Sequence, residues 1–439
     1  MISPPLDIAS SRRLLRWQIG TLALMVVGYS GVYLCRSNLS VALPLVEQSL
    51  VAEGYGEIEA RLWMGRLVTL GVLAYAIGKF ITGSLADFLG GRRNVLVGML
   101  GSVLFTSLFA VSGAVPLFTL AWIGNRAVQS LCWTGMVKIT GRWFSYSRYG
   151  TAMGIVSLSY LFGDAAARQF MSSLLAAGLG WRELFWTAAG VLFVLFVLNL
   201  LLLKESRRAI GMSEPEANPL NVYGAEAKDD QPPPSLRSLL VPLLTSGEFL
   251  VVCLVSLGLT LLRETFNTWS PTYFVEVVGS TGAQAASQSA LFPLLGGASV
   301  ILAGWLGDRL GQGGRSLVML AGCALTTVVL WLLGTLEFAP HALAPVWLVG
   351  LAGFLMLGPY SYLAGAISLD LGGKRGAATA CGIIDGVGYL GAMLAGDSVA
   401  RLNIAYGWSG ALRALAGVAL LTSLAAVVFF VIQRRKIAR

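Results

Sequence analysis

Long apolar segments recur along the whole chain, and they restrict the fold more than any other feature of the sequence. They run from Ile19–Leu34 to Ala414–Ile432. A helix of about 20 apolar residues crosses the hydrocarbon core of a bilayer, and a water-soluble fold of this length cannot bury so many. Only 12% of the residues are charged, roughly half the share in soluble domains. The sequence therefore predicts an all-α protein that lies in the lipid bilayer and has no nucleic-acid partner.

Charged residues and Gly/Pro clusters divide this apolar sequence into about twelve spans. The long polar segment 204–247, which contains Pro232-Pro233-Pro234, is predicted to be a linker. It separates a six-helix half at 1–203 from a second six-helix half at 248–439. The predicted spans are 18–46, 63–85, 94–112, 117–139, 150–178, 184–203, 248–276, 286–306, 316–335, 343–369, 377–402 and 409–432.

The basic residues are distributed unevenly between the predicted loops. Of the 31 Lys and Arg residues, twenty lie in the N-terminus, the C-terminus and the loops after even-numbered spans, and five lie at the opposite side, in loops or near span ends. Loops rich in Lys and Arg stay in the cytoplasm. Both termini and the linker are therefore predicted to be cytoplasmic, and the short loops favour a bacterial inner membrane.

Three landmarks occur twice, in the same order. Arg36 and Pro44 correspond to Arg263 and Pro271 at an offset of 227. The loop motif Gly83, Asp87 and Arg92 corresponds to Gly304, Asp308 and Arg315, and Thr151-Ala152-Met153-Gly154 corresponds to Thr379-Ala380-Cys381-Gly382. Duplicated halves are typical of secondary transporters. The sequence therefore predicts two parallel repeats of six spans.

The loop motif has a structural interpretation. Its glycines allow two helices to approach closely, and Asp87 and Asp308 are expected to meet helix ends and Arg partners. We interpret the motif as a hinge and topology device and not as a substrate contact. Its presence in both halves of such a chain resembles the major facilitator superfamily, which implies a major facilitator fold.

A narrower resemblance begins at Tyr33-Leu34-Cys35-Arg36-Ser37-Asn38 and continues at Gly78-Lys79-Phe80-Ile81-Thr82-Gly83. In the second half it covers Leu261-Leu262-Arg263, Trp269-Ser270-Pro271-Thr272-Tyr273 and Gly388-Tyr389-Leu390-Gly391. These segments are similar to the organophosphate:phosphate antiporters, the family of the glycerol-3-phosphate and hexose-phosphate exchangers.

The resemblance implies a central cavity in which Arg36 and Arg263 face each other and bind the substrate phosphate. It also implies that Lys79 and Tyr33 line this cavity. A guanidinium group stays charged and matches two phosphate oxygens at once. The alternative is that the arginines only form salt bridges with acids such as Glu264, Asp164 or Asp385.

Several other polar residues fall within predicted spans, where a charge is costly and suggests function. Asp164 and Arg168 are four residues apart, so an internal ion pair is favoured over a role in proton coupling. Lys138 either lines the cavity or extends its ammonium toward the membrane surface. The residues considered for the cavity or its gating are Lys138, Arg126, Asp164, Arg168, Asn267 and Asp385.

The sequence also departs from the antiporters. Their fifth span carries a histidine, whereas the only histidine here, His341, falls in a predicted outside loop. Arg126 is a charge unfamiliar in that family, and Ser37 replaces a lysine of the glycerol-3-phosphate exchanger. These differences leave the predicted phosphate site intact, but they leave the organic part of the substrate undefined.

The sequence favours a monomeric secondary transporter that exchanges an organophosphate for inorganic phosphate by alternating access. No enzymatic motif, metal-ligand cluster or cofactor motif is recognisable, so no enzyme activity, metal or cofactor is expected. Two alternatives stay open. One is a proton- or ion-coupled symporter of an organic carboxylate, suggested by the acids within spans. The other is a transporter-like membrane sensor of a phosphorylated sugar.

Overall fold

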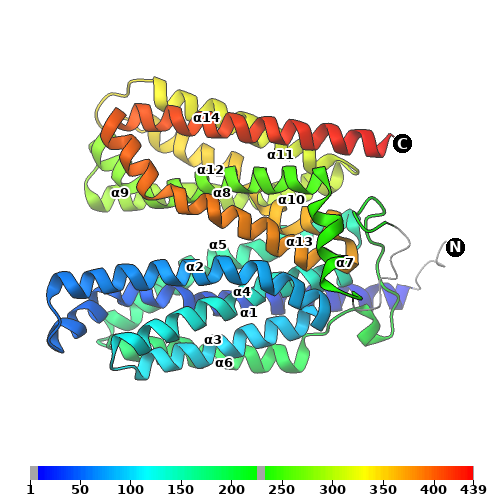
Figure 1. Ribbon diagram of the computed structural model, residues 1–439, viewed down its shortest axis with the longest axis horizontal. Coiled ribbons are helices and arrows are strands. Elements are labelled where there is room, and N and C mark those ends of the chain that lie inside the picture. Colours follow the sequence, from blue (N-terminus) through cyan, green and yellow to red (C-terminus); the bar gives the residue numbers. More distant parts are fainter. Residues whose placement is uncertain (1–7, 225–232, 439) are drawn as a thin grey trace. The chain divides into compact units, whose positions relative to one another are not determined.

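The computed structural model describes residues 8–224 and 233–438, and every regular element in this part of the chain is helical. Twelve of the described helices have between 19 and 45 residues. They are α1 (Ile8–Ala52), α2 (Glu57–Leu89), α3 (Gly91–Val111), α4 (Val115–Trp143), α5 (Tyr149–Ala176), α6 (Trp181–Leu202), α8 (Gly247–Tyr273), α10 (Leu291–Arg309), α11 (Gly314–Thr335), α12 (Ala344–Tyr362), α13 (Ser368–Ala392) and α14 (Asp397–Ile437). The predicted all-α fold is confirmed (Figure 1).

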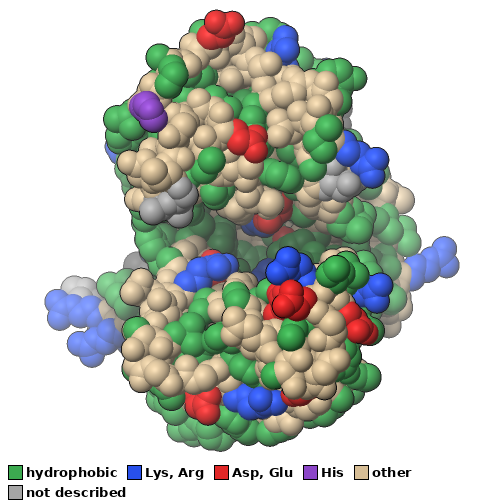
Figure 2. Space-filling view, turned by 90° about the vertical axis from the view of Figure 1, so that its left-hand side faces the viewer, with side chains coloured by type: hydrophobic (Ala, Val, Ile, Leu, Met, Phe, Trp, Pro, Cys, Tyr) green, Lys and Arg blue, Asp and Glu red, His purple; other side chains and the backbone are tan. Residues whose placement is uncertain are grey.

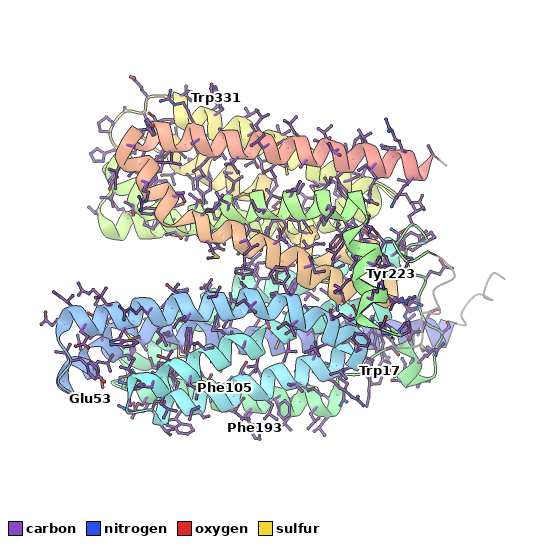
Figure 3. The ribbon with its side chains drawn as sticks, in the orientation of Figure 1. Trp17, Glu53, Phe105, Phe193, Tyr223 and Trp331 are labelled. Carbon is purple, nitrogen blue, oxygen red and sulfur yellow. The ribbon has the colours of Figure 1, made fainter. Side chains whose placement is uncertain are left out.

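Within the described residues, nine helical stretches are long and apolar enough to cross a membrane. One of them, Ala344–Ala395, includes both α12 and α13. Large apolar side chains on the outside of the helices fit a lipid environment: Phe193 is 48% exposed and Trp331 is 55% exposed. Both lie on the outer surface of their helix bundles (Figure 3).

The chain forms two compact units. Unit 1 consists of residues 1–75, 90–145 and 155–216, and unit 2 consists of residues 76–89, 146–154 and 217–439. The end of α2 and the first residues of α5 therefore belong to unit 2.

In unit 1, α1 packs against α6, and α3 packs against both α4 and α6. Small residues let α3 and α4 approach closely, since a Cβ atom on Gly91 would lie 2.4 Å from the carbonyl oxygen of Gly135. The helix α1 runs the length of the unit, with Trp17 near one end and Glu53 just beyond the other (Figure 3).

Unit 2 repeats this pattern of packing. The helix α8 packs against α14, and α11 packs against both α12 and α14. If α8, α11, α12 and α14 are matched to α1, α3, α4 and α6, each of these pairs has its counterpart in unit 1. The internal repeat predicted from Arg36, Arg263 and the loop motifs is thus reflected in the packing of helices.

Several helix boundaries differ from the predicted ones. The span predicted at 377–402 ends earlier, because α13 ends at Ala392, and α14 then begins at Asp397. Gly407 has a φ of 65° within α14, and the predicted start at 409 falls just after this kink. Two short helices, α7 (Leu236–Leu244) and α9 (Gly282–Ser289), were not predicted. They are too short to produce a clear periodic signal.

Part of the predicted linker packs on unit 2. The amide of Val222 donates to the carbonyl oxygen of Leu371 at 2.9 Å, and the hydroxyl of Tyr223 donates to the carbonyl oxygen of Leu239 at 2.7 Å. Burial raises the pKa of Tyr223 above its ordinary value. Tyr223 is labelled in Figure 3. The linker residues 225–232 lie outside the described part of the chain.

The face drawn in Figure 2 shows Lys, Arg, Asp and Glu side chains among hydrophobic and other groups. This view is turned by 90° from Figure 1, in which the long helices run horizontally, so it looks onto helix ends. Charged groups at helix ends can reach water and the lipid headgroups, where they are far less costly than within the hydrocarbon core.

Candidate functional site

In unit 1, Arg36 lies on α1 beside two tyrosine rings. Its guanidinium carbon is 5.1 Å from the ring centroid of Tyr33 and 4.6 Å from that of Tyr75. Arginine is favoured at such positions because its planar cation stacks on aromatic faces and its fixed donor geometry matches the oxygens of a phosphate or carboxylate. The predicted cavity residues Arg36 and Tyr33 are therefore in contact, one turn apart on the same helix.

Arg126 lies in the same cluster. Its guanidinium carbon is 4.8 Å from the centroid of Tyr75, so Tyr75 contacts both arginines. Arg126 is only 5% exposed, and its Nη1 donates to Oε1 of Gln129 at 3.1 Å. Spacing along the chain did not indicate a partner for this arginine. It contacts Tyr75 because α2 lies close to α4 here: a Cβ atom on Gly71 would lie 3.1 Å from Cγ of Arg126.

Aromatic side chains extend this cluster. The rings of Tyr29 and Tyr33 have centroids 5.4 Å apart, and Trp133 on α4 has its centroid 5.7 Å from those of both Tyr29 and Tyr160. Tyr29 and Trp133 are buried. This arrangement gives the Arg36 region a wall that is aromatic and rigid, with hydroxyl groups that can donate hydrogen bonds.

Asp164 and Arg168 form the ion pair predicted from their spacing on α5. Arg168 Nε lies 3.0 Å from Asp164 Oδ2. Asp164 also accepts a hydrogen bond from the hydroxyl of Ser37, the residue that follows Arg36. The pair thereby connects α5 to α1 close to Arg36.

Lys138 lies on α4 and is 4% exposed. A Cβ atom on Gly91 would lie 2.9 Å from the Cβ of Lys138, so the start of its side chain packs against the first residue of α3. The structure therefore places Lys138 in the interior of unit 1, apart from the lipid-exposed positions that a snorkelling lysine occupies.

In unit 2, Arg263 on α8 has two charged or aromatic neighbours. Its Nη2 donates to the carboxylate of Glu264, and its guanidinium carbon is 4.3 Å from the ring centroid of Tyr360 on α12. The acid partner considered in the sequence is thus present. Asn267, one turn further along α8, is exposed.

Lys79 on α2 and Asp385 on α13 form a second ion pair within unit 2. Lys79 Nζ lies 2.7 Å from Asp385 Oδ2, and the lysine side chain is 0% exposed. The helices are close here, because a Cβ atom on Gly382 would lie 2.3 Å from the carbonyl oxygen of Lys79. Two residues that were predicted separately as cavity residues are therefore direct partners.

The aspartates of both loop motifs bind backbone amides, Asp308 at the start of α5 and Asp87 at Thr379, which follows the kink at Gly373 and Gly376 within α13. Asp87 Oδ2 accepts from the amide and the hydroxyl of Thr379, each at 2.7 Å. Asp308 accepts from the amides of Gly150 at 2.9 Å and Thr151 at 2.6 Å, in the first turn of α5. An acid at the positive end of a helix is stabilised there.

The basic residues of the two loop motifs, Arg92 and Arg315, make different contacts. Arg315 contacts the carboxylates of Asp308 and Asp370, each at 2.5 Å. Arg92 instead donates to the carbonyl oxygens of Leu203 at 2.7 Å and Leu200 at 2.6 Å, which are at the end of α6. Repeated sequence motifs therefore do not produce identical contacts.

Unit 2 also contains a cavity of about 180 Å³. Its charged lining groups are already matched with one another: Arg315 contacts Asp308, and Lys436 contacts Glu248. This cavity does not include Arg263 or Lys79 among its lining residues. We therefore attribute it to the packing of the helix ends.

Residues of these clusters that the sequence did not single out include Tyr75, Gln129 and Tyr360. Tyr75 precedes Lys79, a predicted cavity residue, by one helical turn. A single tyrosine within an apolar helix carries no signal of its own, because aromatic residues are common in such helices. Within residues 8–224 and 233–438, no group of three His, Cys, Asp or Glu side chains is placed to hold a metal ion.

Comparison with known proteins agrees with this architecture. Residues 25–396 match the Major Facilitator Superfamily. The structure is similar to the crystal structure of the human organic anion transporter MFSD10, with a TM-score of 0.69, 15% sequence identity and coverage of 93% of this chain and 99% of that chain. At this identity the likeness concerns the fold alone.

Three relatives align with most of the chain. The glycerol-3-phosphate transporter of Bacillus subtilis is 25% identical and aligns with 92% of this chain and 89% of its own length. A probable hexose phosphate transport protein of Chlamydia trachomatis is 24% identical, with coverage of 92% and 89%. The membrane sensor protein UhpC of Escherichia coli is 24% identical, with coverage of 90% and 88%.

These relatives confirm the resemblance to the organophosphate:phosphate antiporters that Arg36, Lys79 and the Trp269–Tyr273 segment indicated. By name they are transport proteins and a membrane sensor protein, and none is an enzyme. The chain belongs to the major facilitator superfamily and is a multi-pass integral membrane transporter.

Proposed function

We propose that this protein exchanges an organophosphate for inorganic phosphate, and that Arg36 and Arg263 bind the phosphate group of either substrate. The observation that carries this proposal is the pair of repeat-related arginines, each stacked on tyrosine in its own unit: Arg36 on Tyr33 and Tyr75, Arg263 on Tyr360. Two matched arginines from two halves suit one shared anion. The names of the relatives support a phosphorylated substrate.

Alternating access would follow from this charge arrangement. The six-helix halves at 1–203 and 248–439, joined by the linker at 204–247, rock about one central site. A bound phosphate offsets the positive charge of Arg36 and the part of the charge of Arg263 and Lys79 that Glu264 and Asp385 do not neutralise, and this lowers the cost of closing the halves. An empty site keeps its charge and reorients slowly, so transport proceeds as exchange.

The uneven distribution of basic residues supports a cytoplasmic location for both termini and for the linker. Short loops support the inner membrane of a bacterium. A monomer suffices, because both halves of the proposed site belong to one chain.

The test is uptake of radiolabelled phosphate into proteoliposomes that contain the purified protein. The liposomes are preloaded with phosphate or left empty, and each set is measured with and without an imposed proton gradient. Exchange predicts fast uptake only into preloaded liposomes, with little effect of the gradient. Uptake into empty liposomes that requires the gradient would contradict exchange.

A proton- or ion-coupled symporter of an organic carboxylate is the second candidate. It is favoured by the pairing of two proposed binding cations with acids, Lys79 with Asp385 and Arg263 with Glu264. A protonatable carboxylate beside a binding cation is a means of coupling proton and substrate movement. Gradient-driven uptake of a labelled carboxylate into empty liposomes would support this candidate, whereas phosphate binding without flux would favour a sensor.

A further inference from the structure

In unit 1, Tyr75 contacts two arginines, Arg36 and Arg126. The guanidinium carbons of Arg36 and Arg126 lie 4.6 and 4.8 Å from the same ring centroid, that of Tyr75. The two cations can therefore be no farther apart than the sum of these distances. A small ligand with two anionic groups can contact both.

Arg126 is held in place by a buried chain of hydrogen bonds. It donates to Gln129 at 3.1 Å, Gln129 donates to Asn125 at 2.6 Å, and Asn125 donates to the carbonyl oxygen of Cys35 at 3.2 Å. Cys35 directly precedes Arg36 in α1. The network therefore fixes Arg126 on α4 relative to the part of α1 that carries Arg36.

The burial of Arg126 is costly, and packing alone is a weak reason for it. A guanidinium remains charged at any physiological pH, and a charge in a membrane span suggests a functional site. Arg126 is also a charge that the resemblance to the antiporters did not lead us to expect.

We propose that Arg126 binds a second anionic group of the organic substrate, so that the preferred substrate is a phosphate ester that also carries a carboxylate or a second phosphate. This inference rests on the proposed function, in which Arg36 and Arg263 bind the first phosphate. Arg126 then determines specificity: it discriminates between esters with one anionic group and esters with two.

The test measures how well unlabelled esters compete with labelled phosphate for exchange in proteoliposomes. Glycerol 3-phosphate has one anionic group, 3-phosphoglycerate adds a carboxylate, and propane-1,3-diol bisphosphate adds a second phosphate. In the wild type we expect both doubly anionic esters to compete at roughly 10-fold lower concentration than glycerol 3-phosphate, the scale of one charged hydrogen-bond pair. The ester that competes best identifies the second group.

Arg126→Gln is expected to remove this preference, so that the ratio between the competing concentrations falls to about one. Arg126→Lys keeps the charge without the bidentate geometry, and it should retain an intermediate ratio. Arg182→Gln is the matched control, since Arg182 is also an arginine of unit 1 that stacks on an aromatic ring, that of Trp181, and its ratio should equal that of the wild type. Size-exclusion profiles and melting temperatures in detergent show whether each variant is folded.

The inference is overturned if the wild type shows no preference, or if Arg126→Gln keeps the wild-type ratio. If Arg126→Gln does not fold, the test depends on Arg126→Lys. A ratio of competing concentrations equal to that of the wild type in this variant would contradict the proposal. A wild type that exchanges no phosphate compound at all would remove the proposed function, and this inference with it. If the wild type exchanges phosphate but does not prefer doubly anionic esters, only the proposed role of Arg126 is contradicted.

Discussion

Arg36 and Arg263 occupy equivalent positions in the two repeats, yet their surroundings differ. Arg36 lies against Tyr33 and Tyr75, and Tyr75 also contacts the second cation, Arg126. Arg263 lies against Tyr360 and donates to the carboxylate of its neighbour Glu264. Both arginines stack on tyrosine, but their charged neighbours differ: Arg36 lies near a second cation, and Arg263 lies beside a carboxylate.

This difference predicts that the regions around Arg36 and Arg263 interact differently with an anionic ligand. The Arg36 region of unit 1 concentrates positive charge, which favours a ligand with more than one negative charge. In unit 2 an incoming anion has to compete with Glu264 for Arg263. Each repeat thus carries one arginine, with a second cation near Arg36 and a carboxylate beside Arg263.

The largest effect is expected from Arg36→Gln. It removes a charged donor of the proposed phosphate site and should weaken phosphate exchange by about 30-fold or more, the scale for losing one partner of a buried charge pair. The measurement is the initial rate of phosphate homo-exchange as a function of concentration. A loss below about threefold would show that Arg36 contributes no more than a surface charge. It would contradict the proposal that Arg36 and Arg263 play equivalent roles in binding phosphate.

Arg263→Gln should also impair exchange strongly, but here a partner variant can restore part of it. Without Arg263, the carboxylate of Glu264 stays near the anion and repels it. Arg263→Gln combined with Glu264→Gln is therefore expected to recover roughly tenfold over the single variant, within the usual range of coupling energies. Adding Glu276→Gln to Arg263→Gln serves as the control, because Glu276 accepts from Trp408, and it should give no such recovery. Equal recovery from the removal of either acid would contradict the assignment of Glu264 to Arg263.

Lys79 and Asp385 provide a test of stability. Lys79→Met leaves the carboxylate of Asp385 without its partner at 2.7 Å, and it should destabilise the protein by about 3 kcal/mol. Adding Asp385→Asn should restore most of the melting temperature measured in detergent. Phosphate exchange should remain low in the double variant, because the proposed binding cation is still missing. Full recovery of exchange would restrict Lys79 to a structural role.

A smaller effect is expected from the two loop motifs. Asp308→Asn weakens bonds to two backbone amides and to Arg315, whereas Asp87→Asn weakens bonds to the amide and the hydroxyl of Thr379. We expect a loss of about 1.5 to 3 kcal/mol for Asp308→Asn and a smaller loss for Asp87→Asn. Thermal unfolding in detergent gives the order. The reverse order would show that the contact of Arg315 with Asp370 compensates for the lost charge.

Much of the fold could be predicted because membrane spans have a strong sequence signal. Apolar length predicted the approximate bounds of most of the long helices, and the repeats of Arg36/Arg263 and Asp87/Asp308 predicted the repeated packing of helices. Boundaries were less certain where a glycine kinks a helix, as at Gly407, because φ is set by the surrounding chain and not by apolar periodicity.

The candidate site was predicted less completely, since spacing along one helix finds only partners on that helix. The ion pair of Asp164 with Arg168 follows from a four-residue spacing. The pairs Lys79 with Asp385 and Arg126 with Tyr75 join helices that are distant in sequence. Only the packing of the chain reveals such contacts.

The most direct test of the central claim is phosphate binding to the purified protein by calorimetry, for the wild type, Arg36→Lys, Arg263→Lys and the double variant. If both arginines bind the same phosphate, each single variant should lose most of the affinity, and the double variant should lose much less than the two losses added together. Additive losses, or phosphate affinity that neither variant changes, would contradict the claim that these two arginines share one phosphate.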